Sequence, residues 1–114
     1  MATRYYLSLP DPKRARGHDA GLAFSAHGAE EFAAQLQDAL RTRSLFERWR
    51  GMQDDPDDVD DALGATDPQA TVSGAQRDLR VDLVATTSLS GGILKHRLRL
   101  LAGNGWELRD VTSA

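Results

Sequence analysis

Two runs of alternating apolar and polar residues predict the main strands of a sheet. Residues 4–9 place three large apolar side chains on one side of the run, and Pro10 ends it. Residues 78–87 alternate in the same way over ten positions. Because successive side chains of a strand point to opposite faces, each run predicts a strand with one buried face. Weaker patterns predict two further strands, at 70–73, joined to the long strand through 74–76, and at 106–111.

Helical periodicity appears in two other places. From Ala29 to about Arg41, apolar side chains recur every three or four positions, which predicts an amphipathic helix. The pattern Ser44-Leu-Phe-Glu47 is typical of a capping box, so we expect this helix to restart there and to stop at Gly51. A last helix is predicted to begin after Ser90 as its N-cap and to end at Gly103.

The order of these elements predicts the fold class. With the helix from Ala29 counted as one element in two pieces, the chain gives an α+β fold with the ferredoxin-like βαββαβ pattern. That pattern places two helices on one face of an antiparallel sheet. Residues 1–114 are expected to form a single domain. Two segments lack periodicity and are interpreted as loops, at 10–27 and 51–69.

The last part of the chain, residues 81–111, has a recognisable sequence of features. A strand pattern is followed by a leucine-rich helix pattern and then by Gly103-Asn-Gly-Trp-Glu-Leu, which enters the final strand. This ending resembles small bacterial domains of unknown function whose helix ends in Gly-x-Gly-Trp-Glu-Leu. The resemblance implies a fold and carries no assigned chemistry.

Length and composition exclude several classes of protein. A chain of 114 residues is typical of one domain with one modest core. Because it contains no cysteine, it has no disulfide framework, thiolate metal site or cysteine nucleophile. No apolar run reaches the length of a signal peptide's core or of a membrane span. We therefore predict a cytoplasmic protein with no membrane partner.

The net charge of −3 hides an uneven distribution. Residues 51–69 contain seven aspartates and no basic residue, whereas the rest of the chain has 14 basic and ten acidic residues. The acidic stretch combines self-repelling charge with proline and glycine, so we expect a mobile loop. None of its frames matches the spacing of a calcium-binding loop, and no metal site is predicted.

Basic residues gather in the other predicted loop. Lys13, Arg14 and Arg16 follow the first strand, and the ferredoxin-like order would bring the hairpin residue Arg77 to the same end of the sheet. A basic end built from loops is typical of sites that bind an anion, a nucleotide or nucleic acid, although basic loops are also often only solvated.

One charge falls within an apolar surface. On a helical wheel, Arg97 lies inside the arc formed by the leucines of the last helix. Either its aliphatic stem packs on the core while its head reaches solvent or a carboxylate, or this flank of the helix is a partner surface with arginine as an anchor. The sequence leaves both interpretations open.

Catalytic motifs are not recognisable. His18, His27 and His96 lack the spacing of metal ligands, and the hydroxyl-rich turn near Ser88 has no nucleophile elbow around it. The sequence therefore favours a non-enzymatic domain without a cofactor, and it does not decide the point.

Self-association is the leading functional prediction. A sheet with helices on one face leaves the other face or an edge strand uncovered, and a second copy can cover it. Tyr6 and Val84 would be the apolar residues of that open face, so we expect them, with Arg97, at the interface of a homodimer or with another protein. The alternative is an anion-, nucleotide- or nucleic-acid-binding module that uses Lys13, Arg14, Arg16 and Arg77.

Overall fold

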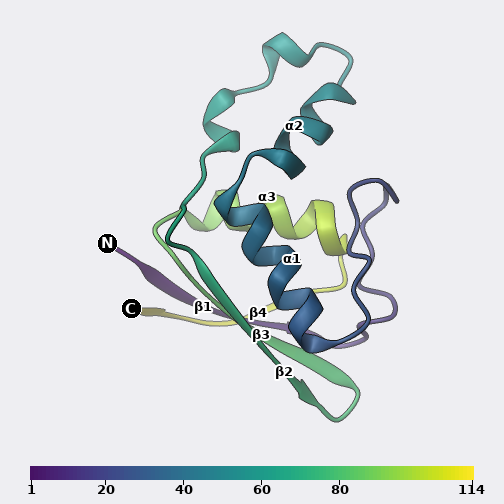
Figure 1. Ribbon diagram of the computed structural model, residues 1–114, viewed down its shortest axis with the longest axis vertical. Coiled ribbons are helices and arrows are strands. Elements are labelled where there is room, and N and C mark those ends of the chain that lie inside the picture. Colours follow the sequence, from purple (N-terminus) through teal and green to yellow (C-terminus); the bar gives the residue numbers. More distant parts are fainter.

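The protein folds around one four-stranded antiparallel sheet. The computed structural model describes residues 1–114 (Figure 1). The strands lie in the spatial order β2-β3-β1-β4, so β2 and β4 form the two edges. This sheet confirms the predicted α+β class. The strands are β1 (Thr3–Leu9), β2 (Thr71–Arg77), β3 (Arg80–Thr87) and β4 (Glu107–Ser113).

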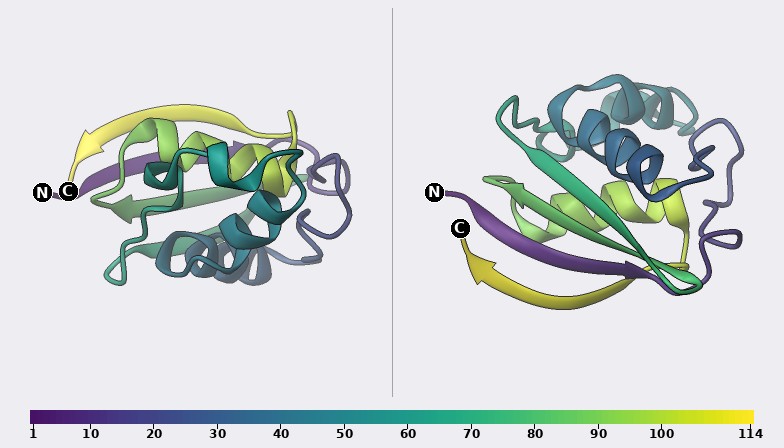
Figure 2. Two further views of the ribbon diagram at one scale, coloured as in Figure 1. Left: turned by 90° about the horizontal axis from the view of Figure 1, so that it is seen from above. Right: turned by 60° about the horizontal axis from the view of Figure 1, so that its bottom comes forward.

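Helices α1 (Ala29–Arg41) and α3 (Gly91–Ala102) cover one face of the sheet, and α2 (Ser44–Gly51) packs against both of these helices on the same side. Figure 2 shows them together on one side, with the other side of the strands uncovered. The chain order is therefore βααββαβ, and the predicted six-element ferredoxin-like order is wrong by one helix. The reason is local, because Thr42 has an extended backbone (φ −129°, ψ 164°) and separates α1 from α2 as two helices.

The break after α1 occurs where the sequence predicted it, but the capping box does not form. Ser44 is the first residue of α2, and its side chain makes no capping hydrogen bond. Glu47 instead accepts hydrogen bonds from the Arg43 guanidinium, the shorter at 2.8 Å. The arginine one turn upstream thus replaces the expected backbone partner.

The core lies between the helices and the inner face of β1 and β3. In the sheet register, Tyr5, Leu7 and Leu9 stand opposite Ala85, Leu83 and Val81. Their alternation with polar residues is the pattern that predicted both strands. The buried apolar residues, except Phe46, form a single cluster. The helices contribute to this cluster most visibly through Phe32, Leu36, Leu40, Leu94 and Leu98.

The turn of the β2–β3 hairpin begins four residues later than predicted. Its turn consists of Asp78, which has a positive φ of 55°, and Leu79. The sequence pattern predicts Gly74 in the turn, but this residue lies in the middle of β2, opposite Leu83. A Cβ atom there would overlap the backbone carbonyl of Ala29 at the start of α1. The glycine thus permits a helix to pack closely against the strand, which a sequence pattern does not distinguish from a turn.

Both ends of α3 match the sequence prediction. The Ser90 side chain accepts a hydrogen bond from the backbone N–H of Ile93 at 3.4 Å. Gly103 follows the helix with φ 60°, a conformation that favours glycine over residues with a Cβ atom. The helix therefore begins and ends where the sequence predicts.

Candidate functional site

The open face of the sheet contains a shallow depression in front of Tyr6 and Val84. The two residues stand opposite each other on β1 and β3, and both are half-buried. Ser73 and Ala75 of β2 continue the floor of the depression, which has a volume of about 380 Å³. Tyr6, Val84 and the two β2 residues thus lie together on the side of the sheet away from the helices.

Three arginines line the same depression. Arg77 and Arg80 flank the hairpin turn, and Arg109 comes from β4. Asp82 holds the first two, with its carboxylate 3.8 Å from Arg77 Nε and 3.1 Å from Arg80 Nε. Arg109 lies 3.3 Å from the carboxylate of Glu107. Because the side chains of these pairs are substantially exposed, each pair adds little to stability and leaves most guanidinium donors free.

The predicted basic loop end is only partly assembled. Lys13 is exposed and lines a hollow with hairpin residues, and Arg14 is exposed 3.5 Å from Asp11. Arg16 instead donates hydrogen bonds to the carbonyls of Phe24 and Ala26, at 2.9 and 2.7 Å, and so holds the 10–27 loop together. Arg77 lines the depression on the open face. The four residues therefore do not form one patch.

The two edges of the sheet differ in their cover. At the β2 edge, α1 packs along the strand, and the Gln37 side chain accepts a hydrogen bond from the Val72 N–H at 3.0 Å. Arg41 of the same helix donates to the carbonyl of Ala70 at 2.6 Å. Along β4 every residue is exposed, and its only strand partner is β1. The free edge of the sheet is therefore β4.

A bulge shapes this free edge. Leu108 lies opposite Leu7 and Asp110 lies opposite Tyr6, so Arg109 is an extra residue without a partner on β1. Three positions separate Leu108 from Val111, and in a regular strand they would point to opposite faces. The bulge places both opposite inward-facing residues of β1, hence on the helix side of the sheet. Their exposed fractions are 37% and 47%.

Arg97 is fully buried within the chain, with an exposed fraction of 0%. Its guanidinium donates hydrogen bonds to the carbonyls of Ala39, Leu63 and Ala65, at 3.3, 2.6 and 2.8 Å. Burial, and secondarily the charge of Arg43, lowers the pKa of this guanidinium from its ordinary value. The head neither reaches solvent nor meets a carboxylate, which corrects the first interpretation, and in this conformation it presents nothing to a partner.

The acidic segment is held at its second half. Residues 61–64 form a short 3₁₀ turn, and Asp61 pairs with Arg43 at 2.8 Å. The Arg43 hydrogen bond lowers the pKa of the Asp61 carboxyl, and the pKa of Arg43 is raised in return. The hydrogen bonds of residues 54–59 are all local. The mobility of the acidic loop stays a prediction, and residues 54–59 are the part of the loop that fits it best.

Near the end of that segment, Asp67 has a buried carboxylate with no basic partner. It accepts hydrogen bonds from the Thr87 hydroxyl at 2.8 Å and from the backbone N–H groups of Ser88 and Gln69 at 2.9 and 3.0 Å. The Ser88 N–H is the largest cause lowering the pKa of this carboxyl, against the opposing effect of burial. Asp67 therefore joins the acidic segment to the end of β3.

The histidines do not gather around a metal. No group of three or more histidine or acidic side chains is placed to hold an ion. His96 is half-buried beside Trp49, with ring centres 4.5 Å apart, and its Nδ1 atom has no hydrogen-bond partner. Burial, followed by the charges of Arg97 and Arg99, lowers its pKa. His96 thus lies on the side of α3 that α2 covers.

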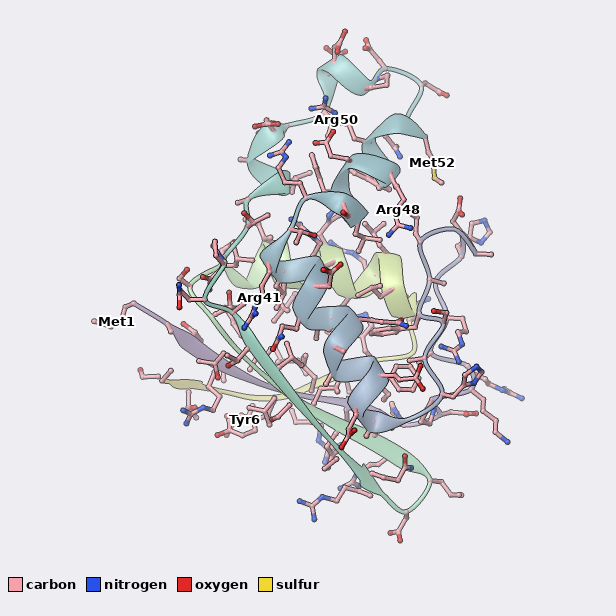
Figure 3. All side chains as sticks on the ribbon, viewed as in Figure 1. Met1, Tyr6, Arg41, Arg48, Arg50 and Met52 are labelled. Atoms are coloured by element: carbon pink, nitrogen blue, oxygen red, sulfur yellow. The ribbon has the colours of Figure 1, made fainter.

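Sequence reasoning missed two of the three arginines that line the open-face depression. Arg80 has the parity of Val84 along β3, so alternation alone could have identified it. Arg109 could not be placed in this way, because the bulge changes the parity of β4 at that residue. Figure 3 shows Tyr6 at the sheet end of the molecule, away from the exposed Arg48 and Met52 around α2.

Comparisons with protein-family models, curated proteins and solved structures find no match to this chain. The resemblance of residues 81–111 to small bacterial domains therefore stays a prediction. None of the helices is both long and apolar enough to cross a membrane.

Proposed function

We propose that this protein is a small α+β domain that works by associating with a second copy of itself through β4. The observation that carries the proposal is the contrast between the edges, since α1 covers β2 and nothing covers β4. An uncovered edge strand presents backbone N–H and C=O groups that another strand can satisfy. Two β4 strands pairing edge to edge would join the sheets of both copies.

The sequence of β4 is complementary to itself in one antiparallel register. If Arg109 of one copy stands opposite Asp110 of the other, a two-fold axis repeats the same ion pair. The same register sets Leu108 opposite Val111 and Glu107 opposite Thr112. Because the bulge puts Leu108 and Val111 on one face, their apolar side chains would meet. Charge and apolar contact thus favour the same pairing.

This interface is expected to be weak. It uses one seven-residue strand and two exposed apolar side chains, which corresponds to the small end of protein interfaces, below about 1,200 Å² in total. Pairing must also release the Val111 N–H, which now donates to the Asp110 side chain at 2.8 Å. We therefore expect a dimer whose population depends on protein concentration.

Sedimentation velocity over a wide concentration range tests the proposal, with Val111→Lys as the disrupting variant. A lysine on the free edge opposes strand pairing because its charge would have to be buried. The wild type should shift toward a dimer as concentration rises, and the variant should remain monomeric. Leu79→Lys is the matched control and should dimerise as the wild type does, since Leu79 is 87% exposed at the tip of the β2–β3 hairpin, which β1 separates from β4.

A charge exchange tests the register. Asp110→Arg places like charges opposite each other and should weaken the dimer, whereas adding Arg109→Asp to it restores the complementary pair and should recover the dimer. A wild type that stays monomeric at every concentration would overturn the proposal. So would equal dimerisation of the wild type and Val111→Lys.

A further inference from the structure

The depression on the open face combines an aromatic floor with an arginine rim. Tyr6 and Val84 form an apolar floor between strands, and Ser73 adds a hydroxyl beside them. Aromatic rings on such a surface stack against planar ligands. A volume of about 380 Å³ lies at the small end of the range of ligand pockets. The volume therefore suits a single planar ring system whose substituent reaches the rim.

The charges around the depression favour an anion. Among its lining residues, three arginines face a single carboxylate, that of Asp82. Asp82 contacts both Arg77 and Arg80, so it holds two guanidinium groups on the same side of the depression. Arginine binds phosphate through two parallel N–H donors, and each of these arginines has donors beyond those used by its carboxylate.

We infer that the open face binds a nucleoside monophosphate, with the base against Tyr6 and Val84 and the phosphate between Arg80, Arg77 and Arg109. Arg109 also takes part in the proposed pairing of β4, so the two sites share this residue, whereas Arg77 and Arg80 belong to β2 and β3 and lie outside that pairing. The ligand site differs from the predicted basic loop end, of which only Arg77 takes part.

Titration with adenosine and uridine 5′-monophosphates at low salt, followed by backbone amide NMR shifts, tests the site. The shifting amides should cluster at Tyr6, Ser73, Ala75 and Val84. Adenosine and inorganic phosphate, used alone, should each bind at least about tenfold more weakly, because each lacks half of the interaction. Using the Val111→Lys protein for the titrations separates ligand binding from any change in dimer population.

Two variants and a control locate the binding energy. Arg80→Met should weaken binding of the monophosphates by about tenfold, the scale of one charge-assisted hydrogen bond. Tyr6→Leu keeps the floor apolar but removes the ring, and it should reduce binding of the monophosphate while leaving binding of inorganic phosphate unchanged. Arg99→Met, on the exposed side of α3, is the matched control and should bind like the wild type.

Several results would overturn the inference. The absence of shifts with both monophosphates is one, and shifts confined to Lys13 and Arg14 are another, since they would assign binding to the loop end. Equal affinity for inorganic phosphate and the monophosphates would show that Tyr6 does not contribute to binding of the base. A single-stranded oligonucleotide that binds far more tightly than either monophosphate would make nucleic acid, and not a mononucleotide, the ligand.

Discussion

Charged residues on the two faces of the sheet differ in their burial and in their partners. On the helix side, Arg97 and Asp67 are buried and satisfied by backbone carbonyls, N–H groups and a hydroxyl. On the open side, Arg77 and Arg80 are exposed to solvent to a substantial degree, and both contact the carboxylate of Asp82. Buried charges that are fully hydrogen-bonded fix structure, whereas exposed ones remain available for exchange with a ligand.

The difference separates residues that hold the fold from residues that can serve a function. Arg97 connects three segments far apart in sequence, namely α3, α1 and the acidic segment. No external ligand can reach it without local unfolding. The ion pairs of the open-face arginines add little to the stability of the fold. Substitutions of these arginines should therefore reduce ligand binding more than they reduce stability.

The largest expected effect comes from Arg97→Met. Methionine fills much of the volume but leaves the carbonyls of Ala39, Leu63 and Ala65 without donors, so unfolding free energy should fall by about 3 kcal/mol or more. Urea unfolding measures the loss. Hydrogen exchange should also show faster exchange in residues 61–67, which the guanidinium holds.

Arg99→Met is the matched control for this prediction, because Arg99 lies two positions away in α3 and is exposed. It should change stability by less than about 0.5 kcal/mol. Equal effects at the two positions would contradict the view that the carbonyl contacts of Arg97 hold the acidic segment.

Asp67 should have the next largest effect. Asp67→Ala leaves the Thr87 hydroxyl and the N–H groups of Ser88 and Gln69 without their acceptor, which should cost about 2 kcal/mol in urea unfolding. Asp54→Ala removes an exposed aspartate of the same segment and should cost almost nothing. Comparable losses for the two variants would show that charge in the segment matters more than the contacts of Asp67.

The same carboxylate predicts a pH dependence. Because folding lowers the pKa of Asp67, its stabilising contribution is complete above the unfolded-state pKa of about 4 and is lost as pH falls through the folded-state value. Stability should therefore fall more steeply below about pH 4 in the wild type than in Asp67→Asn, whose amide does not titrate. Parallel curves would mean that the carboxyl titrates alike in both states.

Gly74→Ala tests the covered edge of the sheet. The added methyl group would overlap the Ala29 carbonyl and press against Leu83, so α1 or β2 must move. Such overpacking costs about 1–3 kcal/mol and should loosen the contact between the helix and the edge. Ala75→Val is the control, since Ala75 is exposed on the other face of β2. Urea unfolding should show a loss only for the first variant.

Most of the fold could be predicted because its signals are local. Alternation identified β1 and β3, and the break at Thr42 and the caps at Ser90 and Gly103 lie within a few residues of their causes. The errors have a different origin. Gly74 serves a helix packed from 45 residues away in the chain, and the Ser44 cap lost its partner to an ion pair with Arg43. Tertiary contacts decided both positions.

The candidate sites were predicted less completely, for the same reason. Tyr6, Val84 and Arg77 were chosen from alternation and topology, and the structure brings them to one depression. The burial of Arg97 could not be foreseen, because two of its three carbonyl partners come from an irregular segment whose apolar content is very low. No glycine marks the bulge at Arg109 in the sequence, so the self-complementary register of β4 could not be predicted either.

Arg80→Met has the smallest expected effect on stability, and it provides the most direct comparison between the two faces of the sheet. Arg80→Met makes the same replacement as Arg97→Met, but Arg80 is half exposed and its partner is a carboxylate that water can also hydrate. The unfolding free energy should therefore change by less than about 1 kcal/mol, and the urea slope should stay the same. If Arg80→Met instead destabilised the fold as strongly as Arg97→Met, the open-face arginines would be structural, and the separation of roles between the two faces would be wrong.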